Sequence, residues 1–260
     1  MKIFLCILLL SCFQVIAQEP AKPDKLIVFK QTPEIDLKLH TFYPKNYDKN
    51  KQYPVIIFFW GGGFRDWRPE QFYRQARYFA NHGMMAYAGE YRVKSRHDIT
   101  MFDCVKDAKS AIRFLKKNKD LLSIDSSRII ASGGSSGGMI AACTEFIDHV
   151  NDDQDDLSFT SRPNALILYN PPLNIRRYDA INPMKFVDPN SAPTLIFHGT
   201  SDEIVSYTQA IDFEERMNAH NNRCDVKIYK DMPHSFFNIT KYNETLSEAH
   251  DFIRSLGWIE

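Results

Sequence analysis

Short apolar runs alternate with segments of helical periodicity along most of the chain. The runs are rich in β-branched and aromatic residues, which is typical of buried strands. They predict strands at 26–29, 37–42, 55–59, 85–90, 128–131, 165–169, 194–198 and 226–229. Segments with apolar positions three and four residues apart predict helices at 70–81, 102–118, 137–147, 207–219 and 244–256. Strands separated by helices favour an α/β fold with a mostly parallel sheet of eight strands.

No repeat, low-complexity tract or long linker interrupts this pattern. We therefore expect a single domain over residues 18–260. The chain has 260 residues, of which 44% are hydrophobic and 25% charged, and this is enough for a substantial core. Only about twenty residues, 170–192, separate the sixth and seventh predicted strands, so there is little material for a cap over the sheet edge.

The first seventeen residues predict a secretory signal. They contain one lysine, an apolar run at 3–10 and a small-residue ending at Ala17, after which we place the cleavage site. The apolar run is too short for a transmembrane helix. An alternative uses the Leu-Ser-Cys sequence ending at Cys12, which resembles a lipobox and would leave a lipid anchor on that cysteine. We favour simple cleavage and a secreted or periplasmic product.

The charge balance excludes polyanion binding as a main function. The chain carries 32 basic and 32 acidic residues, so it has no net charge to attract nucleic acid or an anionic membrane surface. Three cysteines remain after the predicted cleavage, which allows one disulfide at most. We expect each of them to be a small buried apolar residue: Cys104, Cys143 and Cys224.

An acidic stretch at 148–156 has few apolar side chains and predicts a solvated loop. Its aspartates Asp152, Asp153, Asp155 and Asp156 raise the question of calcium. An ordered calcium loop needs a glycine at its bend and a distal glutamate, and both are missing here. We therefore expect no metal at this stretch.

The sequence Gly-Gly-Ser-Ser-Gly-Gly at 133–138 follows a predicted strand and precedes a predicted helix. This is the sequence form of a nucleophile elbow, in which a sharp turn exposes a serine and neighbouring glycines make room for it. The G-x-S-x-G pattern fits twice, with Ser135 or with Ser136 at its centre. The pattern alone does not choose between them.

An acid and a histidine follow the serines in the order that such a fold requires. Asp202 comes just after the predicted strand at 194–198, and His234 lies in the loop after the strand at 226–229. Functional groups of open α/β sheets gather at this carboxyl edge. Glu203 is an alternative acid, and His198 is an alternative base that lies one element too early.

A glycine run at 61–63 directly follows the strand at 55–59. Glycines at this point of the fold let backbone amides turn toward the oxygen of a substrate carbonyl. No Lys-Ser/Thr pair follows, so a phosphate-binding loop is disfavoured.

These residues resemble the α/β-hydrolase superfamily, and within it the small secreted esterases related to acetyl xylan and feruloyl esterases. The resemblance spans about residue 37 to the C-terminus. The family's G-x-S-A-G-G elbow aligns with residues 133–138 and makes Ser135 the nucleophile. It implies Asp202 and His234 as its partners, and no metal or cofactor. The predicted oxyanion donors are the amides of Gly62, Gly63 and Ser136.

The chain departs from the family pattern at Trp60, where the H-G-G-G loop of these esterases has histidine. Trp60 either packs under the loop, which we favour, or lines the substrate cleft. Phe64 and Trp67 are further candidates for stacking on sugar rings, and nearby arginines for pairing with a uronate. We prefer the simpler interpretation of Phe64, Trp67 and the arginines as an ordinary helix entry.

The sequence therefore predicts a secreted serine esterase that removes acetyl or feruloyl-type groups from polysaccharides or oligosaccharides. One alternative is a prolyl-oligopeptidase-like peptidase or a lipase, because both share the fold and the triad. Another is a glycan-binding protein that keeps the fold without catalysis.

Overall fold

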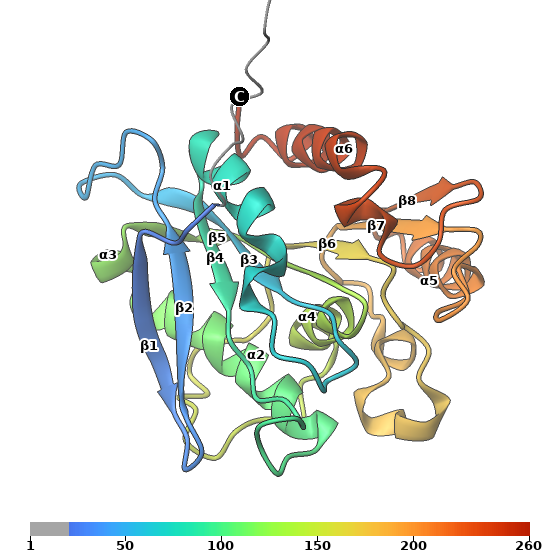
Figure 1. Ribbon diagram of the computed structural model, residues 1–260, viewed down its shortest axis with the longest axis horizontal. Coiled ribbons are helices and arrows are strands. Elements are labelled where there is room, and N and C mark those ends of the chain that lie inside the picture. The colour runs from blue at the N-terminus through green and yellow to red at the C-terminus, as the bar shows by residue number, and fades with distance from the viewer. Residues whose placement is uncertain (1–20) are drawn as a thin grey trace, which may run out of the picture.

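Eight strands form one sheet in the order β1-β2-β4-β3-β5-β6-β7-β8 in residues 21–260, which the computed structural model describes (Figure 1). Strands β1 and β2 run antiparallel to their neighbours, and β4, β3, β5, β6, β7 and β8 are parallel. The eight predicted strands are all present, so the predicted fold class is confirmed. Their bounds are Lys25–Gln31, Asp36–Phe42, Tyr53–Phe59, Met85–Gly89, Ile124–Gly134, Ala165–Tyr169, Thr194–Gly199 and Cys224–Tyr229, for β1 to β8 in chain order.

The five predicted helices are also present, with small differences. They correspond to α1 (Tyr73–Asn81), α2 (Met101–Lys117), α4 (Ser136–Phe146), α5 (Thr208–Ala219) and α6 (Tyr242–Ser255). The first begins as a separate 3₁₀ turn, η1 (Pro69–Phe72), with proline in its first turn. Sequence periodicity missed the short elements, which contain too few residues to show a period: α3 (Lys119–Leu122), η2 (Arg176–Ile181), η3 (Pro183–Phe186) and η4 (Phe236–Asn238).

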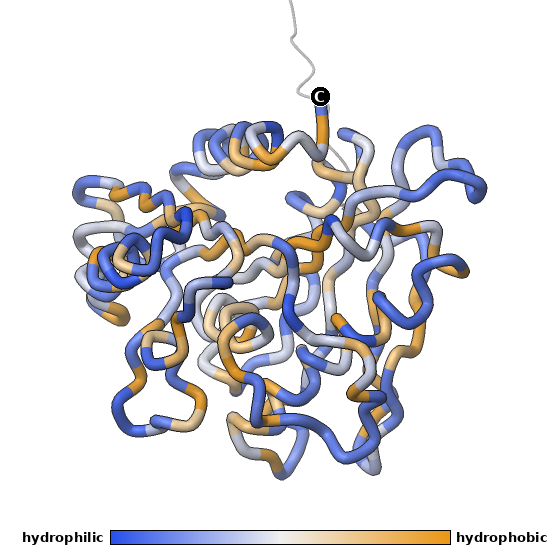
Figure 2. Tube along the Cα trace, turned by 180° about the vertical axis from the view of Figure 1, so that it is seen from behind, coloured by the Kyte–Doolittle hydropathy of each residue, from blue (hydrophilic) through white to orange (hydrophobic). Residues whose placement is uncertain are grey.

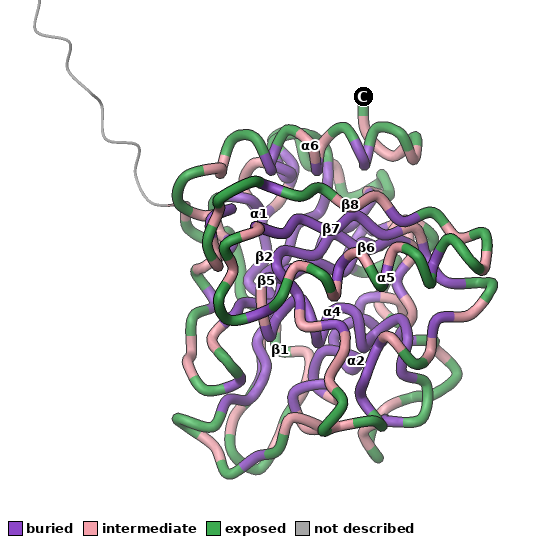
Figure 3. The backbone as a smooth tube through the Cα atoms, turned by 90° about the vertical axis from the view of Figure 1, so that its right-hand side faces the viewer, coloured by how far each residue is buried: buried purple, intermediate pink, exposed green. Residues whose placement is uncertain are grey.

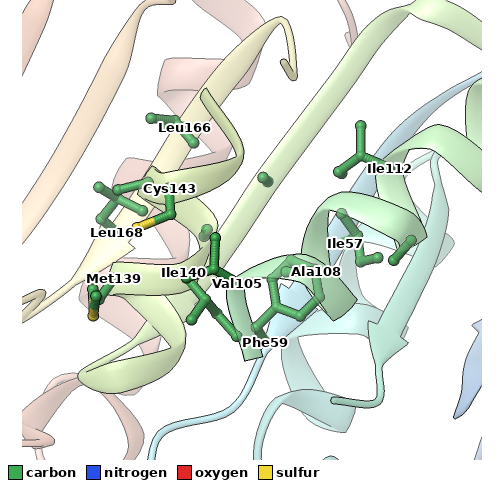
Figure 4. Packing of buried hydrophobic residues seen from close by; sticks show 14 of the residues in the cluster. Ile57, Phe59, Val105, Ala108, Ile112, Met139, Ile140, Cys143, Leu166 and Leu168 are labelled. Carbon is green, nitrogen blue, oxygen red and sulfur yellow. The ribbon is translucent and has the colours of Figure 1, made fainter. Parts of the chain in front are cut away.

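Alternate residues of the central strands enter two different cores. In β3, Ile57 and Phe59 face α2 and α4, whereas Ile56 and Phe58 face α1 and α6. Figure 4 shows part of the first core, where side chains of α2 and α4 meet those of β3 and β6. Figure 3 shows the strands as the buried layer, with exposed positions on the outer helices and loops. Burial on both faces explains why these strands read as continuous apolar runs.

The loops after β3, β5, β6, β7 and β8 all leave the sheet at its carboxyl edge, because these strands are parallel. The connection from β6 to β7 contains only η2 and η3, in agreement with the short predicted cap. The candidate site therefore lies at the edge where the predicted elbow, acid and histidine emerge.

The acidic stretch at 148–156 is not simply a solvated loop, which corrects the sequence prediction. Asp152 pairs with Lys30 of β1 at 2.7 Å, and Asp155 pairs with Arg113 of α2 at 2.6 Å. Asp153 stays exposed. Figure 2 shows hydrophilic residues in many of the outer loops, and in the loop at 148–156 the carboxylates of Asp152 and Asp155 fix the chain to two elements. Composition could not show this, because the partners lie far away in the sequence.

Three further sequence predictions concern single residues or segments. Cys104, Cys143 and Cys224 are free and buried, as expected for small apolar residues. Within residues 21–260, no helix is long and apolar enough to cross a membrane. The predicted signal at 1–17 and the alternative anchor at Cys12 lie outside the described residues.

Candidate active site

Ser135 occupies a sharp turn between β5 and α4. Its backbone angles are φ 52° and ψ −124°, a conformation that a residue with a side chain rarely adopts, and its amide donates to the carbonyl of Tyr169 at 2.8 Å. The turn fits only because Gly137 has no side chain: a Cβ there would lie 2.2 Å from the carbonyl oxygen of Phe59. This is the strained elbow that the glycine and serine pattern predicts.

The structure distinguishes the two serines. Ser135 lines the cavity at the carboxyl edge together with His234. Ser136 is the first residue of α4 and is only 3% exposed. Its hydroxyl accepts a hydrogen bond from the amide of Gly63 at 3.0 Å. Ser135 is therefore the serine placed to meet a substrate.

Asp202 and His234 lie in contact, as predicted. The carboxylate of Asp202 has no exposed surface, and its Oδ2 lies 2.7 Å from Nδ1 of His234. Its Oδ1 accepts the amides of Ile204 and Val205, each at 2.9 Å. The carboxylate therefore requires Nδ1 of His234 to carry the proton, and this leaves a lone pair on Nε2.

The alternatives at this pair do not occupy the same positions. His198 is fully buried behind the aspartate, 3.3 Å from Oδ2 of Asp202 and 3.0 Å from the carbonyl oxygen of Val205. Burial lowers the pKa of His198, so it is neutral near pH 7. Glu203 is exposed, and His234 contacts Asp202 instead.

The oxyanion loop is only partly as predicted. The amide of Gly63 is engaged by the hydroxyl of Ser136, and the amide of Gly61 donates to Oε1 of Gln71 at 2.6 Å. In residues 21–260, the amides of Gly62 and Ser136 have no acceptor within the protein. These two are thus the donors left for a substrate oxygen, and Gly63 is corrected from a donor to a structural tie between the loop and the elbow.

Trp60 packs beneath the oxyanion loop and does not line the cleft, as we favoured from the sequence. Its side chain is 1% exposed and stacks on Tyr91 with ring centroids 4.2 Å apart. Its Nε1 donates to the carbonyl of Asp66 at 2.8 Å, while the hydroxyl of Tyr91 donates to the Trp60 carbonyl at 2.7 Å. The loop is therefore tied from below without the histidine of the related esterases.

The cavity above Ser135 has a volume of about 440 Å³. Phe64, Trp67 and Trp60 do not line it, so substrate contact is wrong for all three, and the simpler interpretations that we favoured hold. Phe64 is 9% exposed, and Trp67 packs against the core. Besides the catalytic candidates and the glycines, the cavity is lined by polar and apolar side chains: Arg65, Asp66, Arg68, Gln71, Ile204 and Phe237.

Sequence reasoning missed one buried residue beside the candidate base. Asn170 directly follows β6, and its Nδ2 lies 3.4 Å from Nε2 of His234. Among the described residues, no hydrogen bond joins Ser135 Oγ to His234; such bonds are often long before a substrate arrives. The only sequence signal for Asn170 was its place just after a strand, at the carboxyl edge of the predicted sheet.

A second cavity of about 500 Å³ lies at the β1 edge, between β1, α2 and the loop at 148–156. Its charged side chains are largely paired with one another, for example Arg113 with Asp155. In residues 21–260, no group of three or more histidine, cysteine or acidic side chains is arranged to hold a metal ion. The candidate site is thus the cavity that Ser135 and His234 line.

The chain is similar to known proteins both in sequence family and in structure. The BD-FAE family model matches residues 39–165 and 142–217. Esterase 2 of Thermogutta terrifontis, phosphorylated by paraoxon, has 36% sequence identity and a TM-score of 0.89, covering 93% of this chain and 96% of its own. The propionate-bound thermophilic esterase Est2 of the same planctomycete has 35% identity and a TM-score of 0.88, covering 92% and 96%. No match is found among the curated proteins.

The fold and these likenesses define a serine carboxylesterase with the α/β-hydrolase fold. The chain belongs to the BD-FAE family, whose model matches more than half of its length.

Proposed function

We propose that Ser135, His234 and Asp202 form the catalytic triad of this esterase. The observation that carries the proposal is the 2.7 Å contact between buried Asp202 and His234, because His234 lines the same cavity as Ser135, which occupies a strained turn. Asp202 fixes the imidazole tautomer, so Nε2 is the atom that accepts the proton of the serine.

The reaction follows in two halves. Ser135 Oγ attacks the ester carbonyl while His234 takes its proton, and the amides of Gly62 and Ser136 stabilise the negative oxygen. His234 then gives the proton to the departing alcohol, leaving an acyl group on Ser135. A water, activated by the same imidazole, attacks this acyl group and releases the acid and the free serine.

For the substrate, we propose short acyl or feruloyl-type groups on a polysaccharide or oligosaccharide. The Thermogutta terrifontis esterase has been captured with propionate and with butyrate, which are short acids. The short connection from β6 to β7 leaves little chain to cover the cavity, so a large carrier can approach. The polar lining residues Arg65, Arg68 and Gln71 suit sugar hydroxyls or a uronate. We propose further that the protein is secreted or periplasmic, where such glycans are met.

The roles of the two serines are tested by a matched pair of variants. Ser135→Ala abolishes hydrolysis of p-nitrophenyl acetate and labelling by a fluorophosphonate probe. Ser136→Ala keeps the nucleophile Ser135, and we expect its rate of hydrolysis to fall about tenfold or less. This loss corresponds to one neutral hydrogen bond, the one between Gly63 and Ser136. An inactive Ser136→Ala variant and an active Ser135→Ala variant would overturn the assignment of Ser135 as the nucleophile.

The substrate class is tested separately. p-Nitrophenyl esters of increasing acyl length are compared with aminoacyl-anilides, and acetate and ferulate release are measured on acylated neutral and uronate-containing glycans. We expect short esters and acylated glycans to be hydrolysed fastest. Faster cleavage of an anilide would favour a peptidase, and a preference for long acyl chains would favour a lipase.

A further inference from the structure

Asn170 lies at the end of β6, between the turn that holds Ser135 and the loop that holds His234. Its side chain is fully buried, and its backbone N–H donates to the carbonyl of Phe197 in β7 at 2.7 Å. Its Oδ1 accepts the amide of Ser235 at 3.1 Å, and its Nδ2 lies 3.4 Å from Nε2 of His234. One side chain therefore contacts both the backbone of the histidine loop and the imidazole itself.

The chemistry of these partners fixes the orientation of the Asn170 amide. The backbone N–H of Ser235 can only donate, so the atom facing it is the oxygen. The nitrogen then points at Nε2 of His234, which holds a lone pair because Asp202 takes the proton at Nδ1. Asn170 thus donates toward the lone pair that must receive the proton of Ser135.

The backbone around Asn170 is also built for this placement. Its φ of 40° lies in the left-handed region, which asparagine tolerates better than most residues with a side chain. The preceding residue, Tyr169, accepts the amide of Ser135 at 2.8 Å. Two consecutive residues at the end of β6 therefore hold the nucleophile on one side and the base on the other.

We propose that Asn170 is a positioning residue for the base: it ties the His234 loop to β6 and directs Nε2 into the cavity before an ester is bound. The inference rests on the proposed function of Ser135 and His234. As the ester is seated, Nε2 exchanges the Asn170 donor for the hydroxyl of Ser135. A donor at this position also disfavours the protonated imidazole, because two N–H groups would then face each other.

Two variants separate these effects. Asn170→Gly removes the side chain while keeping the left-handed backbone available, and we expect kcat to fall about ten- to a hundredfold with KM changed about threefold or less, as for a misplaced base. Asn170→Asp keeps the acceptor for Ser235 but puts a carboxylate beside Nε2. Because a carboxylate favours the protonated imidazole, we expect the acidic limb of kcat/KM against pH to move up by about one unit.

The other groups around the imidazole are the same in every variant. Asp202 faces Nδ1, His198 lies behind that carboxylate, and the other charged side chains that line the cavity are Arg65, Asp66 and Arg68. Asn182→Asp is the matched control, because Asn182 is also buried but lies between η2 and η3 and does not line the cavity. We expect the Asn182→Asp variant to keep the acidic limb of kcat/KM against pH where the wild-type enzyme has it.

The proposal is overturned if Asn170→Asp keeps the wild-type acidic limb, or if Asn170→Gly keeps kcat within about twofold of wild type. If Asn170→Gly does not fold, the pH profile of the Asn170→Asp variant decides. Failure of the underlying assignment has a different signature: Ser135→Ala would then retain activity and the fluorophosphonate would label the wild-type protein elsewhere.

Discussion

Two aspartates, Asp202 and Asp107, have no exposed side-chain surface, yet their partners are of opposite kinds. Asp107 of α2 is held by Arg92, through Nε at 2.9 Å and Nη2 at 3.0 Å, and by Lys30 at 2.7 Å. Asp202 is held by two backbone amides and faces two imidazoles. In residues 21–260, no lysine or arginine pairs with Asp202.

The difference in partners suits the two aspartates to different roles. Arginine and lysine are cations at neutral pH, so Asp107 has permanent cationic partners there. In the proposed mechanism, His234 becomes a cation when it takes the proton of the serine. The carboxylate of Asp202 would then stabilise that transient imidazolium, which is the contribution of an aspartate in a serine triad.

The largest expected effect comes from Asp202→Asn. The carboxamide can still accept the amides of Ile204 and Val205, so the fold should survive. Its nitrogen would face Nδ1 and select the wrong imidazole tautomer, and we expect kcat to fall about 10⁴-fold. Turnover of p-nitrophenyl acetate and thermal unfolding of the same preparation measure the two properties.

Glu203→Gln is the control for this prediction. Glu203 is the neighbouring acid, but its side chain is exposed and His234 contacts Asp202 instead. We expect near wild-type kcat. If Glu203→Gln were inactive and Asp202→Asn active, Asp202 would not be the acid of the proposed triad, and its contrast with Asp107 would fail.

Asp107→Asn should produce the converse result. Removal of its charge takes the shared carboxylate from Arg92 and Lys30, which keep Glu34 at 3.4 Å and Asp152 at 2.7 Å, respectively. We therefore expect the free energy of unfolding to fall by about 3 kcal/mol. Activity per folded molecule should remain. Urea unfolding and active-site titration with the fluorophosphonate measure the two quantities.

Lys30→Met keeps this prediction testable if Asp107→Asn does not fold. It removes one of the two cations and leaves Arg92 to compensate Asp107, while the partly exposed Asp152 also loses its lysine partner. The loss of stability should therefore be smaller than for Asp107→Asn. An inactive enzyme of wild-type stability would contradict a purely structural role for this cluster.

The sequence was enough to predict the sheet and the positions of the three candidate catalytic residues. The strands are buried on both faces, so each gives a continuous apolar run, and parallel strands bring their carboxyl ends to one edge. Ser135, Asp202 and His234 follow such ends and are therefore brought together by topology. Of their side-chain contacts, the one between Asp202 and His234 agrees with this order.

Side-chain direction within a loop was harder to predict. Phe64 and Trp67 are near Gly63 in sequence, yet they turn into the core while Arg65 and Arg68 line the cavity. The direction is decided by bonds such as that of Trp60 to Asp66, which no periodicity reveals. Asn170 was missed for a similar reason, because a single polar residue after a strand has many possible roles.

The smallest expected effect lies at His198, which belongs to the surroundings of Asp202 but takes no part in the proposed proton transfer. Burial lowers the pKa of His198, whereas the unfolded chain has a histidine pKa near about 6.5. Below this pH, His198 binds a proton in the unfolded state but not in the folded state, so the free energy of unfolding falls as the pH decreases. His198→Gln should flatten this slope by at most about 1.4 kcal/mol per pH unit, measured by urea unfolding between pH 7 and about 5.

His82→Gln, at an exposed histidine, is the matched control and should leave the slope of the wild-type protein in place. If His198→Gln also left the slope unchanged, His198 would share the proton of the Asp202 cluster in the folded state. Asp202 would then have a cationic partner, the protonated His198, before the reaction begins. Asp202 and Asp107 would then both have cationic partners in the resting protein.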